Sequence, residues 1–232
     1  MNRKLCAAFA ASLFFAASAE AATLRLDGFT SSLETVNINA APFDSSTRVG
    51  GSGFNMTDTS TTLGSFIAWC LDLGHTLIGV GDSQEYVETN EPFSNSYGLS
   101  DTARARVQAL FDANYADLDT SNGDQAAAFQ MALWESAYED DSAVADVTDG
   151  VFQAASSGST ALANTYLAAA ASYAGAQKFN MTFLEVAGLS ADRARGTGQN
   201  LVTVSAVPLP AAGVLLLTAL GGTALLGRRR KA

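Results

Sequence analysis

The hydrophobic periodicity of the chain changes twice, and this limits the folds that the chain can adopt. Residues 23–100 are rich in Thr, Ser, Val and Phe and are interrupted by Gly, Asn, Asp and Pro, as is typical of strands and turns. Residues 101–175 are rich in Ala and repeat their large apolar residues at helical spacing. Residues 178–186 and 199–205 return to strand character. We therefore expect an α+β fold, an antiparallel β-sandwich or barrel-like domain with a helical insertion.

Local signals place the individual elements. Ser100 can cap a first helix, and the turn signal Ser121-Asn122-Gly123 precedes a second. Gly175 can end a third helix. Two short strands are expected around Thr148-Asp149-Gly150. The other expected strands cover 23–29, 34–40, 64–73, 178–186 and 199–205, and the expected helices cover 101–118, 124–140 and 160–175.

The first 21 residues have the pattern of an export signal. Arg3 and Lys4 form a positive start, and residues 5–17 form an apolar stretch that is too short to cross a membrane. Ala19-Glu20-Ala21 is a small-x-small cleavage site. We expect the mature chain to begin near Ala22, so that Cys6 is removed.

The other end carries a longer apolar segment. Residues 207–227 contain no charged residue, which is enough length for a bilayer core of about 30 Å, and we expect one C-terminal transmembrane helix over about 212–227. A basic tail follows, consisting of Arg228, Arg229, Arg230 and Lys231. Such clusters stay on the cytoplasmic side, so the rest of the chain is expected outside.

The residues just before this segment carry a resemblance. Val207, Pro208, Leu209, Pro210 and Ala211, followed by an apolar span and an Arg cluster, are similar to the VPLPA variant of the PEP-CTERM sorting signal of Gram-negative bacteria. The resemblance implies processing by an exosortase-type enzyme and export to the cell surface or extracellular matrix, after transient anchoring in the inner membrane. A plain C-terminal membrane anchor is the alternative. The chain then divides into a signal peptide (1–21), a surface domain (22–206) and a sorting signal (207–232).

Composition excludes several classes of function for residues 22–206. They contain 7 Lys and Arg and 22 Asp and Glu, a net charge of −15, which argues against nucleic acid or an anionic membrane as a partner. Only Cys70 remains after export, so no disulfide framework can form within the chain. No zinc-type ligand spacing, P-loop or nucleophile elbow is present. We expect no metal and no cofactor.

Two apolar segments stand out around the remaining cysteine. One is Trp69-Cys70-Leu71 on an expected strand, and the other is Phe129-Gln130-Met131-Ala132-Leu133-Trp134 on an expected helix. Together they resemble the motifs of the thioester (TQXA) domain of bacterial surface proteins. The resemblance implies a bond between the Cys70 sulfur and the Gln130 side-chain carbonyl, formed with loss of ammonia. An amine or hydroxyl on a partner would then attack this acyl group, which would leave a covalent link and a free Cys70.

A thioester must be shielded from water until its target arrives. Apolar cover is available from five neighbours of the pair: Trp69, Leu71, Phe129, Leu133 and Trp134. Asp72, Glu135 and Tyr138 are polar and close to the pair in sequence, so they are candidates for assisting the proton transfers. The bond would act once, so the chain is not expected to be an enzyme.

Less specific interpretations stay open beside this one. Cys70 can be an inert core residue. His75 is the only histidine, but a Cys70–His75 catalytic pair five residues apart on a strand and turn has poor geometry, so we expect a satisfied or exposed histidine. Residues 117–124 mimic the start of a calcium loop, and we interpret them as a loop and helix cap.

Two functions follow as hypotheses. The first is a surface-anchored, adhesin-like protein that binds an unknown surface protein or polysaccharide covalently through Cys70 and Gln130. The second is a non-covalent structural or matrix protein of the same sorting class. An exported enzyme is a third class, and no constellation of residues supports it.

Overall fold

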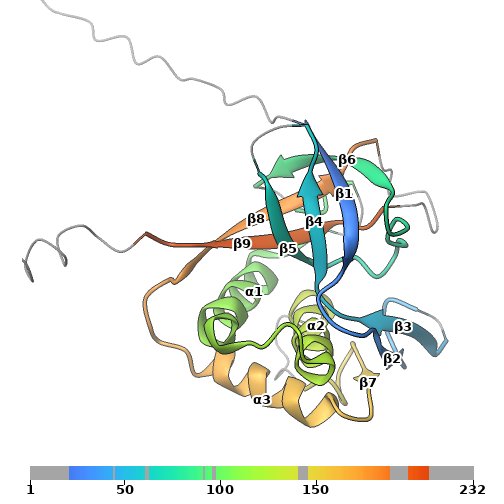
Figure 1. Ribbon diagram of the computed structural model, residues 1–232. Coiled ribbons are helices and arrows are strands. Elements are labelled where there is room, and N and C mark those ends of the chain that lie inside the picture. The colour runs from blue at the N-terminus through green and yellow to red at the C-terminus, as the bar shows by residue number, and fades with distance from the viewer. Residues whose placement is uncertain are drawn as a thin grey trace, which may run out of the picture.

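Six antiparallel strands close into a barrel in the order β1-β4-β5-β9-β8-β6. The computed structural model describes residues 21–208 except 44, 61–62, 91, 96–97, 141–145 and 189–197. The barrel consists of β1 (Ala21–Phe29), β4 (Phe54–Asp58), β5 (Ser65–Cys70), β6 (Ser83–Thr89), β8 (Phe179–Val186) and β9 (Leu201–Ala206). The expected sandwich or barrel is therefore a barrel (Figure 1).

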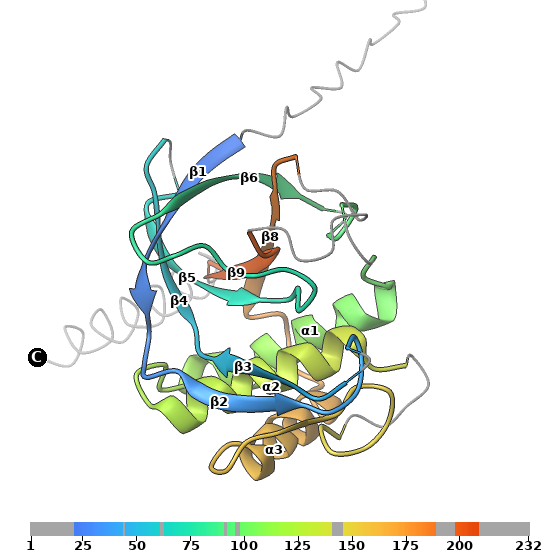
Figure 2. The same cartoon turned by 90° about the vertical axis from the view of Figure 1, so that its right-hand side faces the viewer.

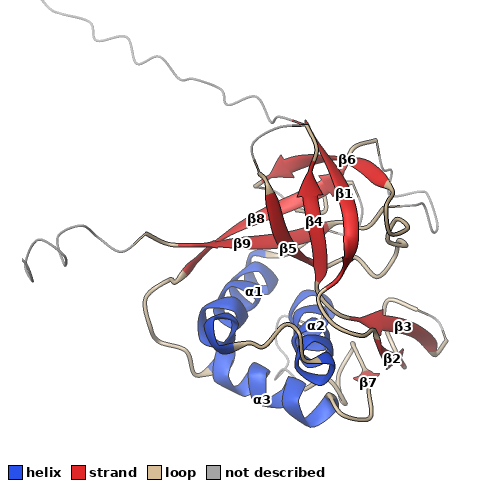
Figure 3. Cartoon of the chain, in the orientation of Figure 1, coloured by secondary structure: helices blue, strands red, loops and turns tan. Residues whose placement is uncertain are grey.

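The remaining elements lie at one end of the barrel (Figures 1 and 3). Three of them are α-helices, and three short strands form a second sheet in the order β3-β2-β7. The helices are α1 (Asp101–Asn114), α2 (Gly123–Tyr138) and α3 (Thr160–Ala171), with a 3₁₀ turn η1 (Tyr115–Asp117), and the strands are β2 (Glu34–Ile38), β3 (Thr47–Gly51) and β7 (Ala154–Ala155).

The barrel follows from alternating burial along its strands. In β1, Ala22, Leu24 and Leu26 are buried, whereas Arg25 and Asp27 between and after them are exposed. This period of two turns one face of the strand inward. β1 pairs with both β4 and β6, and β6 also pairs with β8, so the sheet closes and its strands have no free edge.

Helix α2 is the most buried helix, and it lies between the second sheet and the other helices (Figure 2). Its N-terminus is capped by Asn122, whose side chain accepts a hydrogen bond from the Gln125 N–H. Ser100 caps α1 in the same way, as the sequence predicts. Capping of this kind satisfies backbone N–H groups that have no partner within the helix.

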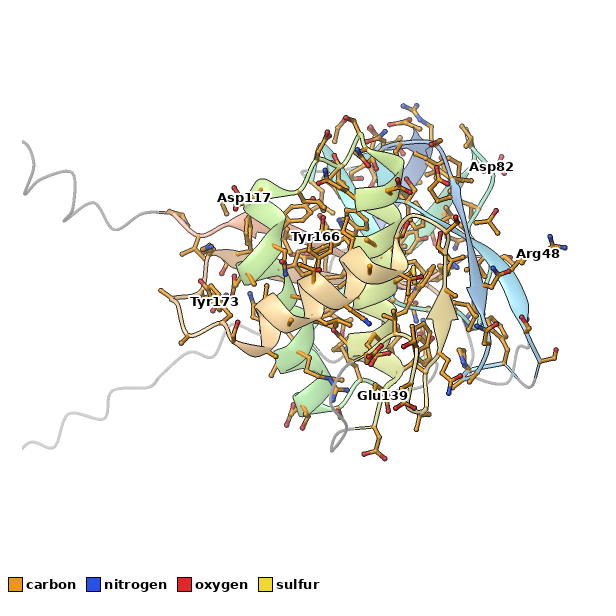
Figure 4. All side chains as sticks on the ribbon, turned by 90° about the horizontal axis from the view of Figure 1, so that it is seen from below. Arg48, Asp82, Asp117, Glu139, Tyr166 and Tyr173 are labelled. Atoms are coloured by element: carbon orange, nitrogen blue, oxygen red, sulfur yellow. The ribbon has the colours of Figure 1, made fainter. Side chains whose placement is uncertain are left out.

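An aromatic cluster joins the helices to the barrel. The Trp69 ring on β5 lies 4.8 Å from the Phe129 ring on α2, and Phe129 also packs against Phe111 at 5.2 Å and Tyr166 at 6.2 Å. Figure 4 shows Tyr166 projecting from α3 among the side chains of the helices. The Tyr115 ring completes the cluster, 5.2 Å from Phe111. The cluster holds α2 against the end of β5.

Two expectations about local structure are wrong. Residues 146–153 form turns, and β7 is the one strand of the two expected in this segment that the described residues contain, because the carboxylates of Glu139 and Asp146 take backbone N–H groups of the turns. Glu139 accepts from the Val151 and Phe152 N–H groups, and Asp146 accepts from Thr148. The third helix ends at Ala171 and not at Gly175. The next residue, Ser172, donates a hydrogen bond from its hydroxyl back to the Ala168 carbonyl.

The two ends of the chain are outside the described residues. The expected signal peptide lies there except for Ala21, as do the expected transmembrane helix over 212–227 and the basic tail. Of the sorting motif, Val207 and Pro208 are described, and the Val207 N–H donates to the Lys178 carbonyl. Between residues 21 and 208, none of the described helices combines the length and apolar character needed to span a bilayer.

Candidate functional site

Cys70 is the last residue of β5, at the place where its neighbouring strand β4 has ended. β4 pairs with β5 only as far as Phe54 opposite Ala68, whereas β9 continues to Leu201 opposite Cys70. The next backbone bond toward β9 is donated by the Leu71 N–H to the Asn200 carbonyl. Since successive residues of a strand direct their backbone groups to opposite edges, the Cys70 N–H and carbonyl face the edge that β4 has left.

The side chain of Gln130 occupies this edge. The Cys70 N–H donates to Gln130 Oε1 at 3.0 Å, and Gln130 Nε2 donates to the Cys70 carbonyl at 2.7 Å. Because the Cys70 N–H needs an acceptor and the Cys70 carbonyl needs a donor, these two bonds fix which end of the Gln130 amide is oxygen and which is nitrogen. Gln130 and Cys70 are 0% and 1% exposed, so the structure brings the two residues into contact in a buried site.

Small residues allow α2 to approach the end of the sheet this closely. Gly51 lies at the end of β3, and a Cβ atom there would sit 3.1 Å from the Ala127 Cβ and 3.0 Å from Val36. Ala126 and Ala128 are also completely buried. A larger residue at any of these positions would push α2, and Gln130 with it, away from Cys70.

The five apolar neighbours expected around the pair are all buried. Trp69 and Phe129 lie on the side of the aromatic cluster. Trp134 lies one helical turn after Gln130 and lines a cavity that Cys70 also lines. Leu71 and Leu133 complete the set, each at most 1% exposed. The surroundings of the Cys70–Gln130 contact are therefore apolar, apart from the groups described below.

The environment strongly favours the neutral thiol of Cys70. Burial raises the pKa of Cys70 to about 12, and the negative charge of Asp72 adds to this effect. The Sγ–H group donates to the Asp72 carbonyl oxygen at 3.3 Å. A thiolate is the nucleophilic form of cysteine, so chemistry at this sulfur requires a nearby group that accepts its proton.

A buried acid–histidine pair follows Cys70 in the turn after β5. Asp72 Oδ2 lies 2.6 Å from His75 Nδ1, and Asp72 Oδ1 accepts from the Gly74 N–H. The two side chains are 1% and 4% exposed. His75 was expected to be satisfied or exposed; it is buried, and its Nδ1 is hydrogen-bonded to Asp72, because the chain turns at Gly74 and brings His75 back over Asp72.

A cavity of about 410 Å³ lies between the barrel, the turn that carries His75 and strand β3. Both Cys70 and His75 line it, as does Trp134. Arg48 stands at its outer side and extends from β3 into solvent (Figure 4). Its remaining walls are mainly apolar: Phe29, Leu33, Phe43, Val49, Phe54, Leu73, Leu77 and Ile78, together with Thr47, Gly50, Gly74, Thr76 and Gln199.

Two tyrosines belong to the same region. Tyr86 is fully buried in the barrel, and its hydroxyl has no hydrogen-bond partner among the described residues. Burial raises the pKa of Tyr86, and the charges of Cys70 and Asp72 add to this effect. Tyr138 on α2 accepts a hydrogen bond from the Leu73 N–H at 2.9 Å, which ties the helix to the turn.

Other candidate groups lie away from the site. Glu135 points to the loop beyond α2, where its Oε1 accepts from the Asp146 N–H, so it does not face Cys70. Asp119 accepts from the Ser121 N–H and hydroxyl within the loop that precedes α2, in agreement with a loop and cap. Within the described ranges, no three His, Cys, Asp or Glu side chains gather as metal ligands would.

Comparisons with known proteins identify no family for this chain. No protein-family model matches the chain, and none of the curated proteins matches it. Among solved structures, the N-terminal domain of the Streptococcus pyogenes pilus tip adhesin Cpa is similar with a TM-score of 0.43 and 14% sequence identity, over 78% of this chain and 100% of that one. At this level of likeness, neither fold nor function can be transferred.

Proposed function

We propose that the chain is an exported surface protein whose Cys70 and Gln130 form an internal thioester, through which it attaches covalently to an amine or hydroxyl of a partner. The observation that carries this proposal is the paired hydrogen bonding between the Gln130 amide and the Cys70 backbone in a buried site. A glutamine whose amide is held against the backbone of a cysteine places an acyl group next to the residue that carries the thiol. The reaction occurs once per molecule and involves no turnover.

The hydrogen bonds suit the formation of this bond. Cys70 Sγ attacks the Gln130 carbonyl carbon, the C–S bond forms, the C–N bond breaks, and the thiol proton leaves with the amide nitrogen as ammonia. The Cys70 N–H already donates to Oε1, the oxygen that becomes negative in the tetrahedral intermediate. The Cys70 carbonyl holds the nitrogen that departs. Preorganised donors and acceptors of this kind lower the barrier because they need no rearrangement during the reaction.

Burial would preserve the bond until a partner arrives. Trp69, Leu71 and Phe129 cover the pair on the inner side. The cavity beside Cys70 and Trp134 provides a route for a slender nucleophile such as a lysine side chain, whose aliphatic part fits apolar walls. The acyl group is therefore shielded from bulk water while it remains accessible to a fitted acceptor.

The termini support the cellular context of the proposal. The export signal and the VPLPA-type sorting signal point to the surface or extracellular matrix of a Gram-negative bacterium, with an exosortase-type processing enzyme as a partner. The acceptor would be a surface protein or polysaccharide. The net charge of −15 over residues 22–206 disfavours nucleic acid.

One observation favours a second candidate function. The high pKa of Cys70 also describes an inert thiol in a core. In that case Gln130 only completes the backbone hydrogen bonding of β5, and the chain is a non-covalent structural protein of the same surface class.

Intact mass of purified residues 22–206 separates the two candidates. The thioester predicts a mass short by one ammonia, which methylamine treatment raises by one methylamine, together with a Cys70 thiol that can be alkylated after unfolding. A full mass with an unmodified Gln130 peptide would contradict the proposal. A full mass with Glu at position 130 would instead report a bond that formed and was then hydrolysed.

A further inference from the structure

We propose that His75, oriented by Asp72, is the base that takes the proton from each nucleophile that attacks the Gln130 carbonyl, first the Cys70 thiol and then the acceptor. This inference rests on the proposed function and assigns its proton transfers to two named residues. The juxtaposition that carries it is a buried Asp–His pair whose histidine lines the same cavity as the reactive cysteine.

The hydrogen bonds define which nitrogen of His75 is available. Asp72 Oδ2 accepts from Nδ1 at 2.6 Å, so the proton of the neutral ring is on Nδ1. The Gly74 N–H holds the other carboxylate oxygen, and Gln199 Nε2 donates to the His75 carbonyl at 2.7 Å. Nε2 therefore keeps its lone pair, and this buried atom has no hydrogen-bond partner within the described part of the chain. A buried nitrogen without a hydrogen-bond partner destabilises the fold, and a catalytic role is one explanation for such a group in a native protein.

The cavity joins this histidine to the reactive cysteine. Cys70, Trp134 and His75 line one space, through which the acceptor would also enter, so the base and both nucleophiles meet at the same cavity. The described charged groups around His75 are Asp72 on its own turn and Arg48 at the outer side of the cavity. Tyr86 inside the barrel and Cys70 are the other titratable groups in this region.

The chemistry requires such a base at both steps. In the first step His75 Nε2 takes the Cys70 proton, the thiolate attacks, and the proton passes to the departing nitrogen, which leaves as ammonia. In the second step the acceptor nitrogen or oxygen bonds to the Gln130 carbonyl carbon and gives its proton to Nε2. The C–S bond then breaks, and the proton passes to Cys70, which regains its thiol. His75 is unchanged at the end of each step.

The test compares His75→Gln and Asp72→Asn with wild type and with Val151→Ala, which alters an exposed side chain that does not line the cavity. Each protein, as residues 22–206, is examined for the loss of ammonia by intact mass and for its rate of coupling to methylamine. Circular dichroism reports whether each is folded. We expect the two variants either to form no bond while folded, or to couple on the order of 100-fold more slowly than wild type. Val151→Ala should behave as wild type.

The outcomes separate the failure of this inference from that of the proposed function. A wild-type protein without the bond defeats the proposed function itself. A wild type with the bond, together with folded His75→Gln and Asp72→Asn proteins that form it and couple at the wild-type rate, overturns only the role of the pair. A further test adds free imidazole to the His75→Gly protein and measures its rate of coupling to methylamine. Imidazole can replace a proton acceptor but not a structural contact, so recovery of coupling supports proton transfer by His75.

Discussion

The side-chain amide of Gln130 stands in for a β-strand as the hydrogen-bond partner of Cys70. β4 begins at Phe54, opposite Ala68, and so does not reach Cys70; the two bonds of 3.0 and 2.7 Å between Gln130 and Cys70 satisfy the backbone groups that are left. The same contact holds α2 against the barrel and places an acyl carbon beside a cysteine. One pair of hydrogen bonds thus serves both the fold and the proposed chemistry.

Gln130 should contribute to stability independently of any covalent bond. Replacing it with Ala leaves the Cys70 N–H and carbonyl buried and unpaired, and since each such group costs about 1–3 kcal/mol, we expect a loss of about 3 kcal/mol in the free energy of unfolding. Urea unfolding in a Cys70→Ala background measures this without a thioester. Gln84→Ala is the control, because among the described residues its amide bonds only to the adjacent Glu85 carbonyl. Equal effects of the two changes would mean that the Gln130 hydrogen bonds are not made.

The Cys70 thiol should be unreactive in the folded protein when no thioester can form. Gln130→Glu has nearly the same shape and lacks the amide nitrogen, so the thiol stays free. Because the pKa of Cys70 rises from 9.0 to about 12, the thiolate fraction at pH 8 falls about a thousandfold. Iodoacetamide should therefore alkylate Cys70 slowly in the native state and rapidly in urea. Fast alkylation of the native variant would show that Cys70 is exposed or activated.

Stability should fall as pH rises through the range in which Glu135 titrates. Burial, with a further contribution from Glu139, raises the pKa of Glu135 from 4.5 to about 8, so the folded state keeps a proton that the unfolded state has lost. The stabilisation is complete below about pH 4.5 and disappears as pH passes 8. Glu135→Gln should flatten this slope, as seen from melting temperatures at several pH values. If the melting temperatures of wild type and Glu135→Gln change with pH in the same way, groups other than Glu135 cause the pH dependence.

The sorting signal should depend on its prolines. Pro208 and Pro210 keep the backbone extended just before the apolar segment, which suits recognition by a processing enzyme at the membrane. Replacing both with Ala should abolish retention at the cell surface and leave the tail uncleaved, as seen by fractionation and the mass of the C-terminal peptide. Unchanged retention of a full-length chain in both proteins would indicate a plain membrane anchor.

Part of the order of the elements could be predicted from local sequence, whereas β3, β4 and β6 were not placed individually. Strands were expected over 23–29, 34–40 and 178–186, and β1, β2 and β8 occupy these places. The caps at Ser100 and before α2 were also predictable, because a cap involves a side chain and backbone three residues away. Strand was expected within residues 146–153, which form turns instead. Their backbone N–H groups bond to the carboxylates of Glu139, which lies on another segment, and of Asp146, which lies across the turn.

The candidate site, too, could be predicted from the sequence only in part. The sequence by itself determined that one cysteine remains after export, that it lies on an apolar strand, and that a glutamine follows on an apolar helix; a resemblance was needed to pair them. Only the tertiary structure decided that β4 does not extend to Cys70, that Gln130 takes its place, and that Asp72 pairs with His75, which lines the same cavity as Cys70. The physical reason is that periodicity and capping act within one or two turns of chain. Unpaired backbone groups, burial and cavity walls are set by segments 60 or more residues apart that meet only in the fold.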